Sequence, residues 1–294
     1  HPYDFVSSFI HENNWANKNI GVEMDAYYYT AENHYRLTST CPNVNFSDAT
    51  LLVNWIRLIK SENEINYMKE GAKLVETGMM TAYENIKPGV KQSYVAGKIQ
   101  NSLIGGNEEI NIGGEYAGLT TILASGVSAS ASHLTPKDNL FNNNEGTIIE
   151  LAGVKHRYHC PLSRTVYCGK PDSKISDTMK ITNEGVEQAI STIKPGKTAH
   201  DVAVAFWSVL EKNGIEKDSR LGYAIGVGYP PDWGEHTMSI RKNDMTILQP
   251  NVTFHMIAGM WMDTWGLEVS ESINVTENGC ELLCNLSRDL HIVN

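Results

Sequence analysis

The sequence predicts an α+β fold made of two similar halves, with a short alternating segment before them. Three observations predict it. The character of the chain changes near residue 60, and the run Ile-Lys-Pro-Gly at 86–89 recurs 107 residues later at 193–196. Two apolar strands also end in Ala-Gly at nearly the same offset. Matches at two places indicate a duplicated unit rather than a short-period repeat, so we expect a site between the halves.

The segment before residue 60 alternates between helical and extended patterns. HPYDFVSSFIHENNW is typical of a helix, IGVEMD of a strand, AYYYTAENHYRL of a helix, and DATLLVNWIRLIK of a strand with a connector. The sequence therefore predicts a first domain at 1–59 and a second domain at 60–294.

Each half of the second domain is expected to start with two helices. Ser61 has the residue type of an N-cap and Glu64 that of its capping-box partner, before a run of helical periodicity that Pro88 and Gly89 end. A second helix is expected after Gln92. The strands GTIIELAG at 146–153 and VTFHMIAG at 252–259 then occupy corresponding places in the two halves.

Composition excludes several classes of function. The net charge of −10 and the absence of a basic run argue against nucleic-acid binding. No apolar stretch approaches the ~20 residues that span a bilayer. Five cysteines, an odd number without a CxxC pair, are typical of reduced thiols in a cytoplasmic enzyme. The chain starts without Met or an apolar leader, so we expect that an N-terminal piece is missing.

The run GYPPDWGEHTMS at 228–239 concentrates reactive side chains in a loop. Its two prolines disfavour a helix, and Asp232, Trp233 and Glu235 follow them directly. We expect this loop to be the second half's contribution to a binding site. The alternative is a loop that Trp233 merely packs in place.

Several runs resemble the creatinase-like family, whose enzymes have the pita-bread fold of two pseudo-symmetric α+β halves. The resemblance covers IGVEMDAYYYTAENHYRL, VNWIRLIKSENEINYMKEGA and SRTVYCGKP. Within this family, ELAGVKHRYHCPLSRTVYCGKP and GYPPDWGEHTMSIRKNDMTILQPNVTFHMIAGMWMDTWGLEVSES are similar to the ectoine hydrolases. The resemblance implies that 1–59 is the remnant of a creatinase-type N-terminal α/β domain, and that the protein is a homodimer.

The same resemblance implies that no metal ion and no other cofactor is bound. The metallopeptidases of this fold hold two metal ions with five side chains. Four of those positions fall on Glu150, Pro161, Tyr223 and Ile257, and the fifth lies near Glu271. Two carboxylates cannot build a dinuclear site. Creatinase, which is also metal-free, has a His where this chain has Tyr223, so its catalytic base cannot be transferred.

The implied activity is a metal-independent hydrolysis of a cyclic amidine. The substrate would be ectoine or 5-hydroxyectoine, opened to N-acetyl-diaminobutyrate. Two alternatives stay open: a creatinase-type amidinohydrolase acting on a guanidino compound, and a catalytically dead pita-bread domain that only binds.

Opening the ring requires a nucleophile at the amidine carbon and a proton for the leaving nitrogen. Glu150, in the apolar strand IIELAG, is the first candidate for the base or nucleophile, because a carboxylate pairs with an amidinium. The alternative is a structural ion pair with Arg157 or Arg164. His159 is the candidate proton shuttle, and Glu235 the third catalytic candidate.

Seven further residues are expected to bind substrate. Trp233 is expected to stack on the amidinium, and Asp232 to cap the turn. Glu268 and Glu271 lie out of phase on a strand, and Glu271 is chosen because it is nearest the family's last carboxylate position. Alternation along an unbroken strand would place Tyr158 beside Glu150. The full set is His133, Tyr158, Tyr223, Asp232, Trp233, His255 and Glu271.

Overall fold

The structure is a computed structural model that describes residues 1–116 and 118–294. The chain divides into two compact units, His1–Arg57 and Leu58–Asn294. The first unit contains helices α1 (Pro2–Glu12), α2 (Ala31–Thr40) and α3 (Leu52–Ile56), and a parallel pair of strands, β1 (Asn19–Val22) and β2 (Asn45–Asp48).

One expectation for the first unit is wrong. The run DATLLVNWIRLIK forms the short helix α3, and the strand β2 ends where this run begins, at Asp48. The side chain of Asp48 accepts a hydrogen bond from the backbone N–H of Thr50 and so turns the chain. The interpretation of 1–59 as part of a creatinase-type domain stays a prediction.

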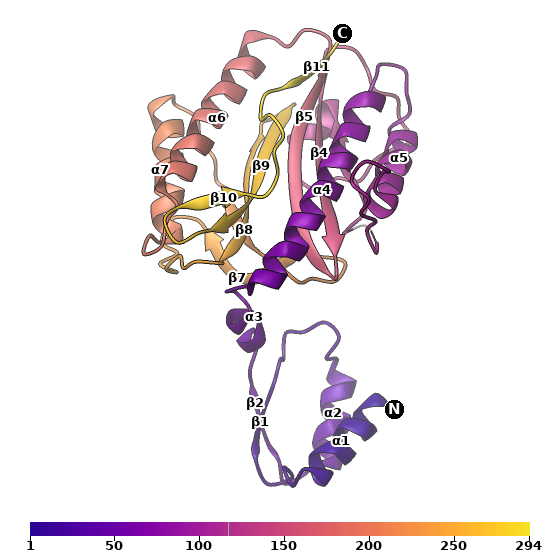
Figure 1. Ribbon diagram of the computed structural model, residues 1–294, viewed down its shortest axis with the longest axis vertical. Helices are drawn as coiled ribbons and strands as arrows, with labels where there is room; N and C mark the ends of the chain where they lie inside the picture. Colours follow the sequence, from indigo (N-terminus) through magenta and orange to yellow (C-terminus); the bar gives the residue numbers. More distant parts are fainter. Residues whose placement is uncertain (117) are drawn as a thin grey trace. The chain divides into compact units, whose positions relative to one another are not determined.

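The second unit contains four helices and nine strands among the described residues (Figure 1). The helices are α4 (Glu62–Asn85), α5 (Gln92–Gly105), α6 (Ser173–Thr192) and α7 (Ala199–Lys212). The strands are β3 (Ile122–Ser125), β4 (Glu145–Lys155), β5 (Tyr158–Cys168), β6 (Gly222–Ile225), β7 (Gly234–Ile240), β8 (Thr253–Trp261), β9 (Gly266–Val275), β10 (Cys280–Leu282) and β11 (His291–Val293). A 3-10 turn covers Gly126–Ser130.

The duplication predicted from the sequence is visible in the backbone hydrogen bonds. Ser61 and Glu64 form the predicted capping box at the start of α4. Gly89 and Gly196 both have φ +84°, and each donates its N–H to a carbonyl, that of Phe141 in the first half and that of Leu248 in the second. The glycines that follow the first helix of each half, Gly89 and Gly196, therefore occupy equivalent positions in the two halves.

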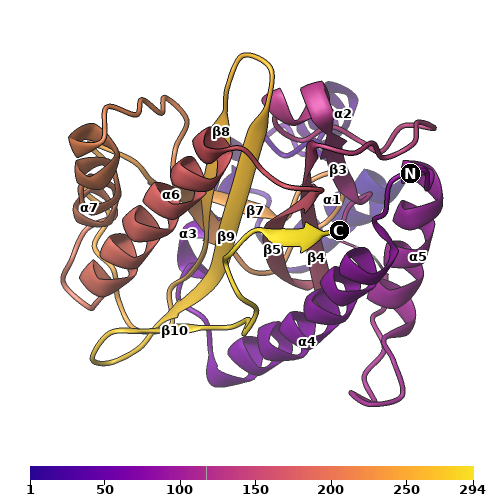
Figure 2. The ribbon, with the colours of Figure 1, turned by 90° about the horizontal axis from the view of Figure 1, so that it is seen from above.

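The strands of the two halves form two hydrogen-bonded sheets. The orders are β11-β5-β4-β3 and β10-β9-β8-β6-β7. The central strands β5 and β9 lie side by side, with α4 and α5 beside the first sheet and α6 and α7 beside the second (Figure 2). Hydrogen bonds to side chains join β5 and β9. For example, the backbone N–H of Ser163 donates to Ser270 Oγ at 2.6 Å.

Alternation along the strands separates two faces of each sheet. Ile149 and Leu151 of β4 pack into the core under α4 and α5, and Leu267 and Val269 of β9 pack into the core under α6 and α7. The residues between them point the other way. We call this second face, which is turned away from the four helices, the inner face.

Helix α4 approaches the first sheet closely at one point. A Cβ added to Gly153 of β4 would lie 2.0 Å from the carbonyl oxygen of Gly71 in α4. Only glycine fits at this crossing. None of the helices in residues 1–116 and 118–294 combines the length and the apolar character that a membrane crossing requires.

Candidate functional site

Glu150 is a buried carboxyl group on the inner face of β4. Its side chain is 1% exposed, and neither carboxylate oxygen has a hydrogen-bond partner among residues 1–116 and 118–294. Burial raises the pKa of Glu150 well above its ordinary value, and the charges of Glu268 and Asp232 raise it further. A structural ion pair with Arg164 is excluded, because that guanidinium is bonded to Glu271. The buried Glu150 carboxyl group therefore lacks, among the described residues, the hydrogen bonds that usually compensate for the burial of a carboxylate.

Two histidines lie next to the Glu150 carboxyl group. His133 Nε2 is 3.4 Å from Glu150 Oε2 and its side chain is 57% exposed. His255 Nδ1 is 3.9 Å from Glu150 Oε1 and is fully buried. Burial lowers the pKa of His255 to about 3, so this imidazole is neutral at physiological pH. Both expected residues are brought together with Glu150.

Glu268 supplies a second buried carboxyl group. Its backbone N–H donates to Thr165 Oγ1 at 2.8 Å, and this hydroxyl donates to the Glu268 carbonyl at 2.9 Å. Ser163, two residues earlier on β5, pairs directly with Glu150 in the β4–β5 ladder. Burial raises the pKa of Glu268 to about 7, while Ser163 and Lys217 act in the opposite direction. The two carboxyl groups are therefore near enough for the charge of Glu268 to raise the pKa of Glu150.

Tyr223 and Trp233 line the same place from the second half. Trp233 Nε1–H donates to Tyr223 Oη at 2.8 Å, and His255 Nδ1 lies 3.0 Å from the same oxygen. Burial raises the pKa of Tyr223 well above 10, and the charge of Glu150 adds to the rise. We call Glu150, Glu268, His133, His255 and Tyr223 the Glu150 cluster.

The proline-rich loop provides only part of what was expected of it. Trp233 is buried and packs with Tyr223, so it does belong beside the cluster. Asp232 Oδ1 accepts from the backbone N–H of Gly234 at 2.8 Å, which confirms that it caps the turn, and its Oδ2 lies 2.8 Å from His236 Nε2. Substrate contacts for Asp232 and stacking on Trp233 stay predictions.

The expectation that Glu271 faces the site is wrong. Glu271 lies on the opposite face of β9 from Glu268 and Ser270, because three residues along a strand reverse the direction of the side chain. Its Oε1 accepts from Arg164 at 2.9 Å. Arg164 also donates to the carbonyls of Ser270, Leu286 and Ser287 at 2.5–2.8 Å. Arg164 therefore has a structural role, as the partner of Glu271 and not of Glu150.

The expected place of Tyr158 is also wrong. Strand β4 does not continue to Tyr158, since His156 and Arg157, both with positive φ, form a two-residue hairpin turn. Tyr158 therefore points to the α4 side, where its hydroxyl donates to Glu64 at 2.6 Å.

His159 also lies on the inner face, but it precedes Ser163 on β5 and pairs with Val154 near the β4–β5 turn. Its Nδ1 is bonded to the Arg157 carbonyl at 2.9 Å and its Nε2 lies 3.3 Å from Tyr116 Oη. No hydrogen bond joins it to Glu150 among the described residues. The shuttle role predicted for His159 has no support from this geometry.

Glu235 is held in a buried ion pair. Its Oε2 is 2.7 Å from Lys60 Nζ, and both side chains are at most 1% exposed. Lys60 Nζ also donates to the Leu58 carbonyl. The pair joins the start of the second unit to the strand after the proline-rich loop, so a structural role fits Glu235 better than the predicted catalytic one.

Three residues of the site were missed. Glu268 was the alternative to Glu271 as the residue that faces the site, and Ser270 and Arg220 were not among the predicted site residues. The apolar residues Leu267 and Val269 alternate with Glu268 and Ser270, and this pattern would have placed the two polar side chains together. The Arg220 guanidinium lies 4.5 Å from the centre of the Tyr223 ring, and nothing in its local sequence indicates this.

The burial of His159 predicts a measurable effect of pH on stability. Burial lowers its pKa to about 4 in the folded protein, against an ordinary 6.5. The unfolded chain therefore binds the proton first, and stability is lost as the pH falls below 6.5. At pH 5 the loss relative to pH 7.5 is about 2 kcal/mol.

Chemical denaturation of the wild type and of His159→Gln at both pH values measures this contribution. We expect the change between pH 7.5 and 5 to differ by about 2 kcal/mol between the two proteins. The difference is used because the raised pKa of Glu268 changes stability in the opposite sense. Identical pH dependence in the two proteins would contradict the prediction.

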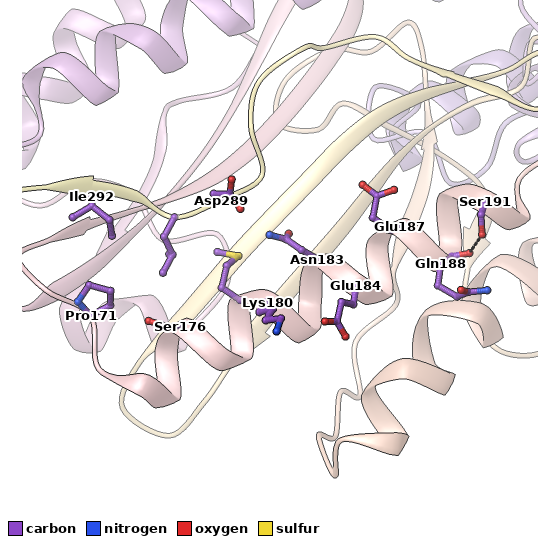
Figure 3. A pocket seen from close by; sticks show the side chains of 12 residues that line it. Pro171, Ser176, Lys180, Asn183, Glu184, Glu187, Gln188, Ser191, Asp289 and Ile292 are labelled. Atoms are coloured by element: carbon purple, nitrogen blue, oxygen red, sulfur yellow. Dashed lines mark hydrogen bonds between the residues drawn. The ribbon is translucent and has the colours of Figure 1, made fainter.

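A groove of about 910 Å³ lies apart from these residues, between α6 and the C-terminal segment (Figure 3). Lys180 and Glu184 of α6 lie along it, and Asp289 and Ile292 come from the C-terminal segment. None of its lining residues belongs to the Glu150 cluster. The groove is therefore a separate feature of the surface.

Comparison with known sequences shows extensive similarity. The model of metallopeptidase family M24 matches residues 66–277. The ectoine hydrolase of Halomonas elongata is 41% identical over 99% of this chain and 74% of its own length. An uncharacterised hydrolase/peptidase of Sinorhizobium fredii is 40% identical over 99% of this chain and 74% of its own length.

Two solved structures share the fold at low sequence identity. An X-Pro aminopeptidase from Thermotoga maritima superposes with a TM-score of 0.86 and 21% identity, over 99% of this chain and 78% of that one. An Xaa-Pro dipeptidase from Bacillus anthracis gives a TM-score of 0.87 and 20% identity, over 99% and 78%.

Proposed function

The chain belongs to metallopeptidase family M24, and we propose that it hydrolyses ectoine without a bound metal ion. It is a hydrolase acting on carbon–nitrogen bonds, and its fold is the predicted pita-bread fold. The observation that carries the proposal is the Glu150 carboxyl group, which is buried between the halves and has no hydrogen-bond partner among the described residues.

The residues present do not fit a dinuclear metal site. No three His, Cys, Asp or Glu side chains within 1–116 and 118–294 are arranged to hold a metal ion. Pro161 and Ile257, at two of the ligand positions that the resemblance implies, have no side-chain donor atom. The Tyr223 oxygen is engaged by Trp233 and His255. This donor set favours a metal-free reaction.

A cationic amidine offers the hydrogen-bond donors that the carboxyl groups of the Glu150 cluster lack among the described residues. Glu150 and Glu268 each have at least one buried oxygen without a partner, and an amidinium offers N–H donors and a positive charge to both. Charge-assisted hydrogen bonds of this kind are stronger than neutral ones. Binding would lower the pKa of both carboxyl groups, because the cation favours their ionised forms.

Hydrolysis then follows from the position of Glu150. As a base, Glu150 takes a proton from water while the water oxygen bonds to the amidine carbon. The same proton passes to the ring nitrogen, the carbon–nitrogen bond breaks, and an N-acetyl-diaminobutyrate is released. As a nucleophile, Glu150 would bond to that carbon itself, the ring carbon–nitrogen bond would break as the nitrogen takes a proton from solvent, and water would then break the bond to Glu150 and release the same product. Both routes need the ionised carboxylate at the amidine carbon.

The substrate's own carboxylate also finds a partner. Arg220 lies over the Tyr223 ring at 4.5 Å, and its charge lowers the pKa of both His133 and His255. A positive charge beside the Tyr223 ring and the two histidines, together with two buried carboxyl groups, suits a small zwitterion, which ectoine is. This arrangement favours a substrate with a cation at one end and an anion at the other.

An assay with purified protein separates the candidate functions. Ectoine, 5-hydroxyectoine and creatine are incubated separately, and ring opening or urea release is followed by proton NMR. We expect turnover of an ectoine and none of creatine. Turnover of creatine alone would favour the creatinase-type amidinohydrolase. Binding of ectoine without turnover would favour the catalytically inactive domain that only binds.

The second prediction of this proposal concerns metal removal. Exhaustive dialysis against a chelator should leave turnover of ectoine unchanged, with residual metal checked by elemental analysis. The physical reason is the apolar Pro161 and Ile257 at ligand positions. Loss of activity that Mn²⁺ or Zn²⁺ restores would contradict metal independence.

The homodimer and the cytoplasmic location stay predictions. Light scattering of the purified protein tests whether it is a homodimer.

A further inference from the structure

A chain of hydrogen bonds runs behind the Glu150 carboxyl group. Ser163 N–H donates to Ser270 Oγ at 2.6 Å, and Ser270 Oγ lies 2.7 Å from His255 Nε2. His255 Nδ1 lies 3.0 Å from Tyr223 Oη, which also accepts from Trp233 Nε1–H at 2.8 Å. The two ends of this chain are fixed as donors, because a backbone amide and an indole can only donate.

The direction of the middle bonds depends on which nitrogen of His255 carries the proton. Within residues 1–116 and 118–294, the bonds of Ser270 Oγ are those to Ser163 and His255. If Nε2 carried the proton, Ser270 would have to accept twice, and its own buried hydroxyl proton would have no acceptor. If Nδ1 carries it, Ser270 donates to Nε2, and the hydroxyl proton of Tyr223 is the one left without an acceptor among the described residues. Each form leaves one buried hydroxyl proton without an acceptor, so the count of hydrogen bonds does not decide between them.

The Glu150 oxygen beside the ring decides between the two forms. Glu150 Oε1 lies 3.9 Å from His255 Nδ1. An N–H at this nitrogen presents the positive end of its dipole to this oxygen, which is negatively charged in the carboxylate and carries partial negative charge in a carboxyl group protonated on Oε2, whereas a lone pair would be repelled. The low pKa of His255 keeps the ring neutral, so it holds one proton. The position of the Glu150 oxygen therefore places this proton on Nδ1.

Tyr223 Oη then accepts two hydrogen bonds, one from Trp233 and one from His255, which use both of its lone pairs. Its own proton is left to donate. We propose, resting on the function proposed above, that Tyr223 is a catalytic hydrogen-bond donor whose hydroxyl proton is directed at a nitrogen of the adduct formed at Glu150. Tyr223 keeps its proton throughout, since the proton balance of the reaction is completed by water and Glu150.

This donor acts on the transition state and not on the bound substrate. The nitrogens of an amidinium have no lone pair available, because both take part in the delocalised cation. Addition to the carbon gives each nitrogen a lone pair, which can then accept from Tyr223. An interaction made only after addition raises kcat and leaves substrate binding unchanged.

The kinetic test is Tyr223→Phe, which removes one oxygen atom. We expect kcat to fall about 100-fold with KM changed by less than about threefold, the scale of losing one preorganised donor. Tyr167→Phe is the matched control, since that tyrosine is also buried and bonds only the Asn144 carbonyl among described residues. A Tyr223→Phe protein with unchanged kcat, or with its loss confined to KM, would overturn the proposal.

The direction of the hydrogen bonds is tested separately from activity. ¹⁵N NMR of protein with labelled histidine reports which ring nitrogen is protonated, and a His255→Gln variant assigns the signal. We expect the Nδ1–H form at pH 7.5, and the Nε2–H form would overturn the donor role. If the wild type did not hydrolyse ectoine, the proposed function would fail, and the NMR result would still decide the direction of the Tyr223 bond.

Discussion

Replacing Glu150 by Gln is expected to lower the turnover of ectoine at least ~100-fold, the scale on which a positioned base or nucleophile is lost. The amide keeps the shape of the side chain but has no charge for the amidinium and little basicity. The fold should survive or become slightly more stable, because burial already raises the pKa of this carboxyl group and so disfavours its charged form. Steady-state kinetics and thermal denaturation measure the two effects.

Glu145→Gln is the matched control, since Glu145 begins the same strand but is bonded to Asn142 and is not fully buried. It should keep normal turnover. A near-normal rate for Glu150→Gln would show that Glu150 is a structural acid. Glu268, the other carboxyl group of the cluster, would then become the candidate base.

The largest effect on stability is expected from Arg164→Met. The guanidinium is completely buried and bonds the Glu271 carboxylate and the carbonyls of both β9 and the C-terminal segment. Methionine would leave several carbonyl oxygens without donors, and the buried Glu271 carboxylate would keep, among the described residues, only the longer contact with Arg288, at 3.4 Å. Breaking a buried pair from one side costs about 3–5 kcal/mol, measured as the free energy of unfolding in denaturant.

An exposed ion pair provides the control. Lys242 Nζ lies 2.8 Å from Glu211 Oε1, with both side chains about half exposed. Lys242→Met should cost less than about 1 kcal/mol. If Arg164→Met cost as little, the Arg164 network would be dispensable. The double variant Arg164→Met, Glu271→Leu should recover part of the lost free energy of unfolding, because it also removes the buried carboxylate that loses its guanidinium partner.

Much of the fold could be predicted because it depends on local signals. The capping box at Ser61, the breaks at Gly89 and Gly196, and the apolar strand around Glu150 all act within a few residues. The strand predicted after residue 48 failed because the turn formed by Asp48 outweighed the apolar run that follows.

The candidate site could be predicted only in part. Glu150, His133, Tyr223, His255 and Trp233 were named from the sequence, and the structure brings them together. Tyr158 and Glu271 were misplaced for one shared reason. The direction of a strand residue depends on register, and a hairpin turn or an odd number of residues reverses it.

The sequence by itself determined the duplication, the types of side chain available, and the loss of donor atoms at Pro161 and Ile257. Only the tertiary structure decided which acid meets Glu150, because Glu268 and Glu150 are distant in the chain and meet through the contact between β5 and β9. It also decided that Glu271 and Glu235 are bound by Arg164 and Lys60. The physical reason is that a carboxylate's role depends on burial and on the cation beside it, and tertiary contacts supply both.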